Sequence, residues 1–327
     1  MRITVVGAGA MGTLMAARLS SAMASGTGGA VSERPERVIL YGRPSPHLEA
    51  IQRDGVRLTE RDGTTHTIPV QVTTEPADVA GSELIIVLVK SWATAESVKP
   101  LRSHLTRDAV VLTLQNGLGN AAQLRSALLH DGVRPHVWLG VTTQAALRTE
   151  PGCVTHSGEG ITVIGRRSSE VNTRLQEIAA TLTSAGIPTT AVDDIHRWVW
   201  RKLAVNAAIN PVTALADVPN CAVRKNHDLQ NACRLLASEA AAVASARGLA
   251  LDEQQVMDAV NDVAEATGDN RSSMLIDLEN GLRTEIDAIN GAIVKEAHRR
   301  GIPAPANQLM VSLIRARASR QERQGRD

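Results

Sequence analysis

The first residues of the chain place a strand, a glycine turn and the start of a helix in immediate succession. RITVVG (2–7) is a short run rich in β-branched residues, and Gly7, Gly9 and Gly12 then have the spacing G-x-G-x-x-G. Apolar residues at helical spacing follow at once in MGTLMAARLSSAM. In such a unit the first glycine permits a tight turn, the second lets backbone amides approach a pyrophosphate, and the third lets helix and strand pack closely.

This turn predicts a dinucleotide site, because the helix N-terminus also provides a favourable field for an anion. The alternative is a glycine-rich turn with a purely structural role. The residues expected to contact the dinucleotide are Gly7, Ala8, Gly9, Ala10, Met11 and Gly12.

The end of the second expected strand indicates which dinucleotide is bound. RVILYGR (37–43) ends in Arg43 and carries no carboxylate. An NAD site usually has Asp or Glu here to hold the ribose hydroxyls, whereas an NADP site needs a cation for the 2′-phosphate. We therefore expect NADP(H), with Arg43 as the phosphate ligand. A solvated turn arginine is the alternative.

Strand-like and helix-like segments alternate through the first half of the chain. The near-continuous apolar runs ELIIVLVK (83–90) and AVVLTLQNG (109–117) are typical of parallel strands buried on both faces. The alternation predicts a parallel α/β sheet. Helices are expected at 47–55, 93–105 and 119–129, a hairpin at 56–70 around Asp62 and Gly63, and a flexible insertion at 21–36, where Gly, Ser and Ala dominate.

The second half of the chain changes character near residue 193. Residues 137–165 are strand-rich, and a helix at 171–185 and a short strand follow. From Asp193 onward the pattern is almost entirely helical. A chain of 327 residues exceeds what one core usually organises. We therefore expect an α/β domain at 1–192 followed by an all-α domain at 193–327.

Composition excludes several classes of protein. The 35 basic residues balance 34 acidic ones, which gives no reason to expect a nucleic-acid or membrane partner. Cys153, Cys221 and Cys233 are odd in number and lack CxxC spacing, so neither a disulfide framework nor a metal site is expected. The chain opens directly on a strand and has no apolar run of about 18 residues, which predicts a cytoplasmic protein.

Polar residues follow both buried strands, at the edge where doubly wound sheets bind their ligands. Lys90 ends the first run, and Asn116 ends the second within QNGLGN. Asn116 is therefore placed to face cofactor and substrate. A turn-forming Asn-Gly pair is the alternative, and Lys90 carries the same ambiguity.

A third polar group interrupts an apolar helix. In KLAVNAAINPVTAL (202–215), Lys202, Asn206 and Asn210 are four residues apart and share one helix face. The face is either functional or a solvated stripe. Pro211 predicts that the helix ends or kinks at Asn210.

With these blocks in order, the chain resembles the ketopantoate reductase (2-dehydropantoate 2-reductase) family. The match runs through GAGAMG, LVKSWAT, QNGLGN, VTTQAALRTEPGCVTHSGEG, KLAVNAAINPVTAL with VPN, and NRSSMLIDLENGLRTEIDAINGAIV, and covers nearly the whole chain. The resemblance implies a Rossmann-like NADP-binding domain, a helical substrate domain and an active site in the cleft between them. It further implies NADPH-dependent reduction of 2-dehydropantoate to pantoate, on the way to pantothenate and coenzyme A.

The resemblance also assigns roles to individual residues. Lys202 corresponds to the family's general acid, which agrees with the need to neutralise the alkoxide that hydride addition produces. Asn206, Asn210 and Asn220 correspond to substrate contacts, and Ser273 to a ligand of the substrate carboxylate.

Two further positions take roles from the same resemblance. Glu285 corresponds to a carboxylate near both the lysine and the cofactor, and Ala146 to a backbone contact with the cofactor. Ordinary helix capping is the alternative for Ser273 and for Glu285, since Thr284 and Asp287 have the spacing of a capping box.

The sequence also departs from the family pattern. The insertion at 21–36 makes the alignment of Arg43 less secure, and Gln144 stands where a histidine is common. His156, a lone histidine on a strand, is expected to be structural. Two other functions stay open: a family reductase for another 2-oxo acid, and a non-catalytic dinucleotide sensor. The apolar C-terminal helices either pair in a homodimer or cover one another within one chain.

Overall fold

The computed structural model describes residues 1–25, 34–166 and 172–324, with the side chains of 321–324 excepted. The chain divides into two compact units. Unit 1 comprises Met1–Gln115 and Asn120–Ile195, and unit 2 comprises Asn116–Gly119 and His196–Asp327. The loop that follows the second buried run therefore belongs to unit 2.

An eight-stranded sheet forms the centre of unit 1. From one edge to the other its strands are β12 (Thr189–Ala191), β11 (Thr162–Gly165), β8 (His136–Thr142), β7 (Val110–Thr113), β6 (Leu84–Val87), β1 (Arg2–Val6), β2 (Arg37–Tyr41) and β5 (Gln71–Thr73). The six strands from β8 to β5 are parallel, as expected. β11 is antiparallel to β8, and β12 is parallel to β11. The chain between β8 and β11 forms the hairpin of β9 and β10 and contains no crossover helix. A parallel connection needs such a crossover, so β11 returns antiparallel to β8.

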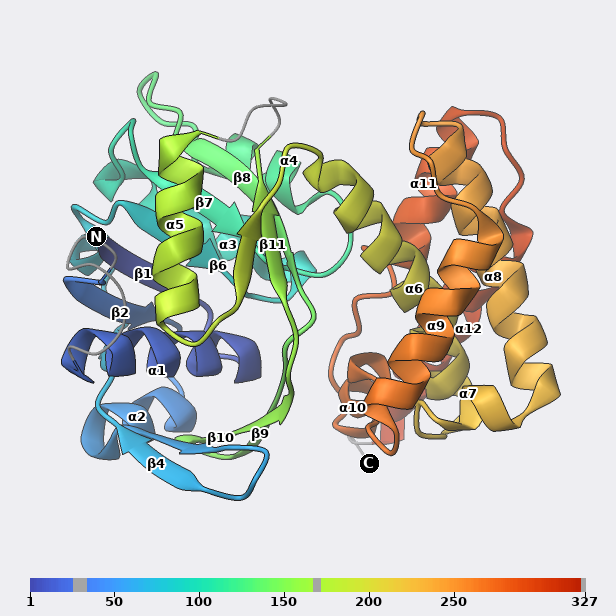
Figure 1. Cartoon of the computed structure of the whole chain (residues 1–327), viewed down its shortest axis with the longest axis horizontal. Coiled ribbons are helices and arrows are strands. Elements are labelled where there is room, and N and C mark those ends of the chain that lie inside the picture. Colours follow the sequence, from blue (N-terminus) through green and yellow to red (C-terminus); the bar gives the residue numbers. More distant parts are fainter. Residues whose placement is uncertain (26–33, 167–171, 325–327) are drawn as a thin grey trace. The chain divides into compact units, whose positions relative to one another are not determined.

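Helices cover both faces of this sheet (Figure 1). α1 (Ala10–Ser25) and α5 (Thr173–Ser184) pack on one face, through residues such as Met15 and Ile178. The other face is covered by α3 (Thr94–Val98), the 3-10 helix η4 (Lys99–His104) and α4 (Asn120–Ala127), with Leu101 and Leu124 buried. Shorter elements complete the unit: α2 (Pro46–Asp54), η2 (Pro76–Val79) and η3 (Ser91–Ala93).

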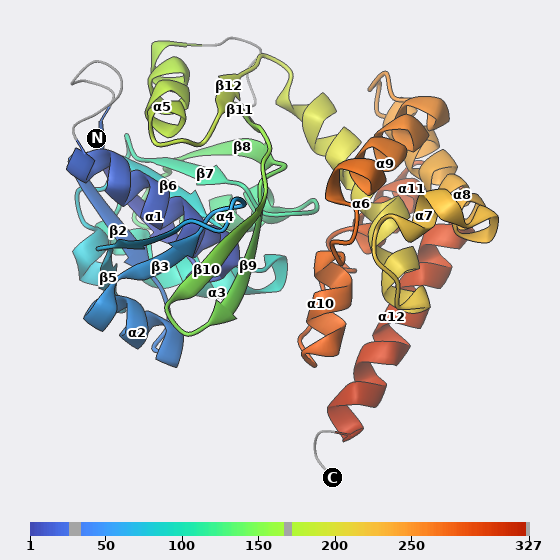
Figure 2. The ribbon, with the colours of Figure 1, turned by 60° about the horizontal axis from the view of Figure 1, so that its bottom comes forward.

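A second sheet of four strands packs beside α1 (Figure 2). Its order is β4 (Thr65–Ile68), β3 (Val56–Thr59), β10 (Cys153–Gly158) and β9 (Ala145–Glu150). The hairpin expected at 56–70 is confirmed by the antiparallel pairing of β3 with β4.

The expectation of a flexible insertion at 21–36 is wrong in its first part. Residues 21–25 continue α1 to Ser25, and Ala22 on this last turn is buried, so the helix extends by packing. The Glu36 amide donates to the carbonyl of Met1, which leads the chain into β2. The rest of the predicted insertion, 26–33, lies outside the described residues.

Unit 2 is helical. Its elements are α6 (Ile195–Ala216), α7 (Ala222–Lys225), α8 (His227–Ser245), α9 (Glu253–Thr267), α10 (Ser273–Glu279), α11 (Asn290–Arg299) and α12 (Pro305–Gln324). α6 contributes Leu203, Ala204 and Ala208 to the same apolar core as α8, α9, α11 and α12. Alanines along α6 leave room for close helix contact. Together the two units confirm the expected fold class, an α/β domain followed by a helical one.

Across the described ranges 1–25, 34–166 and 172–324, no helix has the length and apolarity needed to cross a membrane. The same ranges contain no cluster of three or more His, Cys, Asp or Glu that could hold a metal ion.

Candidate active site

The glycine turn joins β1 to α1 with each glycine in a different environment. Gly7 has φ +113°, and a Cβ there would lie 2.9 Å from the backbone nitrogen of Val89. A Cβ on Gly12 would lie 1.8 Å from the carbonyl oxygen of Gly7, so helix and strand touch at this point. A Cβ on Gly9 would meet no atom within 4 Å. The first and third glycines are thus required by packing, and the second faces open space.

The open space at Gly9 suits a pyrophosphate. The amide groups of the first turn of an α-helix have no partner within the helix, and they attract anions. The first turn of α1, which includes Ala10 and Met11, contains no acidic residue that would oppose an anion. The residues present therefore fit a dinucleotide phosphate.

Arg43 follows β2, the strand that pairs with β1 in the sheet. Its side chain is exposed, and it makes no hydrogen bond or ion pair with the residues that the structure describes. The ordered turn around it is fixed by Ser45, whose hydroxyl accepts from the Leu48 amide and caps α2. Arg43 is therefore a guanidinium available to an external anion.

Lys90 lies at the carboxyl end of β6, where it occupies the N-cap position of η3. Gln115, just after the neighbouring strand β7, connects the end of β7 to the segment around Lys90. Its Nε2 donates to the Val89 carbonyl and to the Thr94 hydroxyl, each at 2.8 Å. The two strand ends that sequence reasoning selected are therefore cross-linked by a residue it did not select. Thr94 and Val89 are the partners that could not be known without the sheet order.

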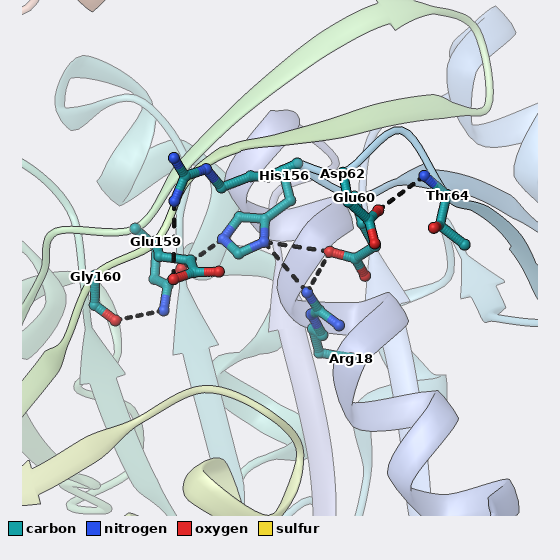
Figure 3. Close-up of polar contacts among 9 residues, drawn as sticks. Arg18, Glu60, Asp62, Thr64, His156, Glu159 and Gly160 are labelled. Carbon is teal, nitrogen blue, oxygen red and sulfur yellow. Dashed lines mark hydrogen bonds and ion pairs between the residues drawn. The ribbon is translucent and has the colours of Figure 1, made fainter. Parts of the chain in front are cut away.

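His156 belongs to a polar cluster that links α1, the end of β3 and the segment around β9 and β10 (Figure 3). Gln144 joins this cluster through its side-chain amide. His156 Nε2 lies 2.7 Å from Oε1 of Gln144, whose Nε2 donates to the Gly160 carbonyl at 2.6 Å. On the other side of the ring, Arg18 lies 3.2 Å from Nδ1 and pairs with Glu60 at 2.7 Å. Since Gln144 presents its oxygen to the ring, Nε2 donates a hydrogen bond to it, while Nδ1 faces both Arg18 and Oε2 of Glu60, the latter at 3.4 Å.

This cluster fixes the start of β9, where Ala146 lies. Ala146 pairs with His156 across the two antiparallel strands. Gln144 comes immediately before β9, at the carboxyl end of β8. Gln144 thus receives a hydrogen bond from His156 and is held in place by it.

The loop Asn116–Gly119 packs within unit 2. Gly117 has φ +83°, and a Cβ there would lie 2.4 Å from the Ala288 carbonyl oxygen. The Leu118 amide donates to that same carbonyl at 2.9 Å. Asn116 Nδ2 then lies 3.4 Å from Oε2 of Glu285. The glycine is required because the loop and the turn at 285–289 are in direct contact.

Glu285 and Lys202 interact electrostatically in the same unit. Glu285 is buried, with 7% of its surface exposed. Burial lowers the pKa of Lys202 from 10.5 to about 8, and the nearby Glu285 carboxylate opposes part of this effect. A lysine with a pKa near neutrality can both hold a proton and give it up, as a general acid must.

α6, which carries the polar face, continues past Pro211. The helix runs to Ala216, so of the two outcomes predicted at Asn210, an end or a kink, the end is wrong. Pro211 has no amide to donate to the carbonyl of Ala207, and Nδ2 of Asn290 donates to that carbonyl at 2.9 Å. Asn206 is partly buried and Asn210 is buried, which argues against a solvated stripe.

Ser273 opens α10 next to this face. Its neighbour Ser272, not Ser273, caps the helix by accepting from the Leu275 amide. Ser272 Oγ also lies 2.9 Å from the Thr213 hydroxyl of α6 and 3.5 Å from the Asn210 carbonyl. Ser273 is exposed. Capping therefore does not explain Ser273.

The capping alternative for Glu285 is also wrong. α11 begins at Asn290, and residues 286–289 form turns, so Thr284 and Asp287 do not frame a helix start. Asp287 instead pairs with Arg315 at 2.6 Å. Packing against α12 takes precedence over the local capping pattern.

Asn220 presents an unsatisfied oxygen. Its Nδ2 donates to the Thr267 hydroxyl at 2.9 Å, and that hydroxyl donates in turn to the Val263 carbonyl at 2.6 Å. The orientation of the amide follows from this chain of donors. Oδ1 of Asn220 is buried and has no hydrogen-bond partner among the residues that the structure describes. A buried acceptor of this kind can take a hydrogen bond from an ordered water or from a ligand.

Comparison with known proteins identifies the family. A family model described as ketopantoate reductase PanE/ApbA matches residues 3–169, and one described as its C terminal matches residues 194–318. The chain belongs to the ketopantoate reductase family. The resemblance read from the sequence is thereby confirmed, as is the expectation of an oxidoreductase.

Relatives of the ketopantoate reductase family match over nearly their full length. The 2-dehydropantoate 2-reductase of Halobacterium salinarum is 38% identical over 315 residues, which cover 96% of this chain and 98% of that protein. The one from Pyrococcus horikoshii is 34% identical over 319 residues, 98% of each.

Solved structures give the same result. A PanE/ApbA family ketopantoate reductase from Ralstonia eutropha has a TM-score of 0.85 at 32% identity, with 98% of this chain and 100% of that chain covered. D-mandelate dehydrogenase, solved with NADH and anilino(oxo)acetate, has a TM-score of 0.87 at 24% identity and 98% and 100% coverage. At that identity the likeness supports the fold alone.

Proposed function

We propose that this chain reduces 2-dehydropantoate to pantoate with NADPH, and that Lys202 is the general acid. One observation carries the proposal: Lys202, whose pKa is about 8, interacts electrostatically with the buried carboxylate of Glu285. Lys202 shares its face of α6 with Asn206 and Asn210. The choice of substrate is supported by the full-length relatives, which are named 2-dehydropantoate 2-reductase.

The proposal gives unit 1 the dinucleotide. The backbone at Gly7–Gly12 holds the pyrophosphate, and Arg43 pairs with the 2′-phosphate. The other cofactor contacts in this proposal are Lys90, which follows β6 of the eight-stranded sheet, and Ala146 on β9 of the four-stranded sheet, together with Asn116 and Glu285. When bound, NADPH supplies the hydride.

The proposal gives unit 2 the substrate and the proton. As the C2 carbonyl of the 2-oxo acid becomes an alkoxide, the Lys202 ammonium stabilises the negative charge and then donates its proton. Glu285 keeps the ammonium charged, since a nearby opposite charge favours the charged form. The balance is one ketone, one hydride and one proton to one alcohol.

The amide and hydroxyl groups orient the substrate. Asn206, Asn210 and Asn116 offer hydrogen bonds to its hydroxyl and carbonyl oxygens, and Asn220 offers an acceptor. Ser273, at the first position of α10, suits the carboxylate because its hydroxyl and the free amides of the first turn are all donors. A dinucleotide sensor would have no use for this set.

A steady-state assay of nicotinamide oxidation tests the proposal. NADPH and NADH are each combined with 2-dehydropantoate and with a panel of other 2-oxo acids. We expect the highest kcat/KM for 2-dehydropantoate with NADPH. A preference for a different 2-oxo acid would replace the substrate, and turnover of none of them would overturn the proposal.

A further inference from the structure

Pro211 creates a defect inside α6. Proline has no backbone N–H, so the carbonyl four residues earlier, that of Ala207, lacks its helical donor. Ala207 is fully buried, which excludes solvent as the replacement. An unpaired buried carbonyl is costly, so another donor is required.

Asn290 supplies that donor. This residue opens α11 and is fully buried, and its Nδ2 donates to the Ala207 carbonyl at 2.9 Å. The second hydrogen of the same amino group is donated to Oδ1 of Asn307 at 3.0 Å. Both donors of the Asn290 amide are therefore in use.

The orientation of Asn290 is fixed from α8. Glu239 accepts from the backbone amides of Ala306 and Asn307, at 2.7 and 2.9 Å, and from Nδ2 of Asn307 at 2.8 Å. A carboxylate accepts only, so Asn307 turns its nitrogen to Glu239 and its oxygen to Asn290. Asn290 must then present its nitrogen to both Asn307 and Ala207.

The hydrogen bond falls on the buried side of the helix turn that runs from Asn206 to Asn210. Ala207 follows Asn206, and Pro211 follows Asn210, so the defect spans the turn between the two amides. We propose that Asn290 is a positioning residue: it takes the place of the amide that Pro211 lacks, and it holds the turn of α6 that presents Asn206 and Asn210 to the substrate. This inference rests on the proposed function.

The inference predicts a rescue. Asn290→Ala removes the donor, and we expect KM for 2-dehydropantoate to rise about 10-fold or more, because small displacements of orienting groups are costly. NADPH affinity should stay within about two-fold, since Asn290 does not contact the glycine turn. Pro211→Ala restores a backbone N–H, so the double variant Asn290→Ala with Pro211→Ala should return KM to within about three-fold of the unmutated value.

A control separates positioning from general stability. Ile293→Val deletes a buried methyl group from the same helix without touching the amide network. This variant should lower the melting temperature and leave KM unchanged. An Asn290→Ala protein that is folded and has an unchanged KM would overturn the inference, and so would a double variant whose KM stays high.

Folding and function are distinguished by the same set. If Asn290→Ala alone fails to fold, the double variant decides: recovery of fold and KM supports the inference, and failure of either overturns it. If the unmutated protein reduces 2-dehydropantoate while Asn290→Ala leaves KM unchanged, only this inference fails. If the unmutated protein reduces no 2-oxo acid, the proposed function fails first and the positioning role falls with it.

Discussion

Arg43 is the residue on which the choice of dinucleotide depends. It is an exposed guanidinium at the end of β2 with no partner among the described residues. We expect NADPH to bind more tightly than NADH, and Arg43→Ala to narrow the difference by about 1–3 kcal/mol, the range for a charge-assisted hydrogen bond. Fluorescence titration with both cofactors measures it. Arg53→Ala, another exposed arginine, is the control, and equal affinities in the unmutated protein would refute the assignment.

Burial of Lys202 also affects the stability of the fold, apart from the proposed role of this residue as an acid. Its pKa is lowered by burial from 10.5 to about 8, which corresponds to about 3 kcal/mol against the charged form. The sign follows from the unfolded chain, which binds the proton more tightly, so the destabilisation is complete below pH 8 and is lost as pH rises to 10.5.

Lys202→Met is therefore expected to stabilise the protein at pH 7 by about 1–3 kcal/mol while it abolishes activity. The gain should shrink at pH 10. Denaturant unfolding at the two pH values measures both effects, and Lys295→Met, on the exposed side of α11, should change stability little. A destabilised Lys202→Met protein at pH 7 would contradict the account.

At the scale of elements, the glycine turn makes opposite predictions for two of its glycines. Gly9→Asp places a carboxylate in the open space against the pyrophosphate, so we expect loss of NADPH binding with an unchanged melting temperature. Gly12→Ala forces a Cβ against the Gly7 carbonyl oxygen, so we expect a loss of stability. Thermal melts and cofactor titrations distinguish them. Normal NADPH affinity in Gly9→Asp would show that the turn is structural only.

Elements with a local signal could be predicted from the sequence, and elements set by distant contacts could not. The glycine turn and the face of α6 were predictable because their spacing is written within a few residues. The reversal of β11, the absence of a helix start at Thr284 and the passage of α6 through Pro211 depend on partners far along the chain. Asn290 is 83 residues from Ala207, and its only sequence signal is that a buried helical proline needs a donor from elsewhere.

At the scale of the whole molecule, unit 1 is proposed to bind the dinucleotide and unit 2 the 2-oxo acid. Substitutions in unit 1 should change dinucleotide affinity, and substitutions of the α6 amides in unit 2 should change KM for the 2-oxo acid. Asn206→Ala and Asn210→Ala are thus expected to raise KM by about 5- to 30-fold, the range for a hydrogen bond of about 1–2 kcal/mol, with NADPH affinity unchanged. Steady-state kinetics and cofactor titration on each variant test the division. Near-neutral effects of both would instead indicate a solvated face.

The central claim is that Lys202 protonates the developing alkoxide. The most direct measurement is kcat of Lys202→Ala for 2-dehydropantoate at saturating NADPH, with the dissociation constant for NADPH determined alongside. The account predicts that kcat falls by about 10²- to 10⁴-fold, the effect of removing a general acid, while NADPH affinity changes little. A Lys202→Ala protein that retains full kcat would contradict it.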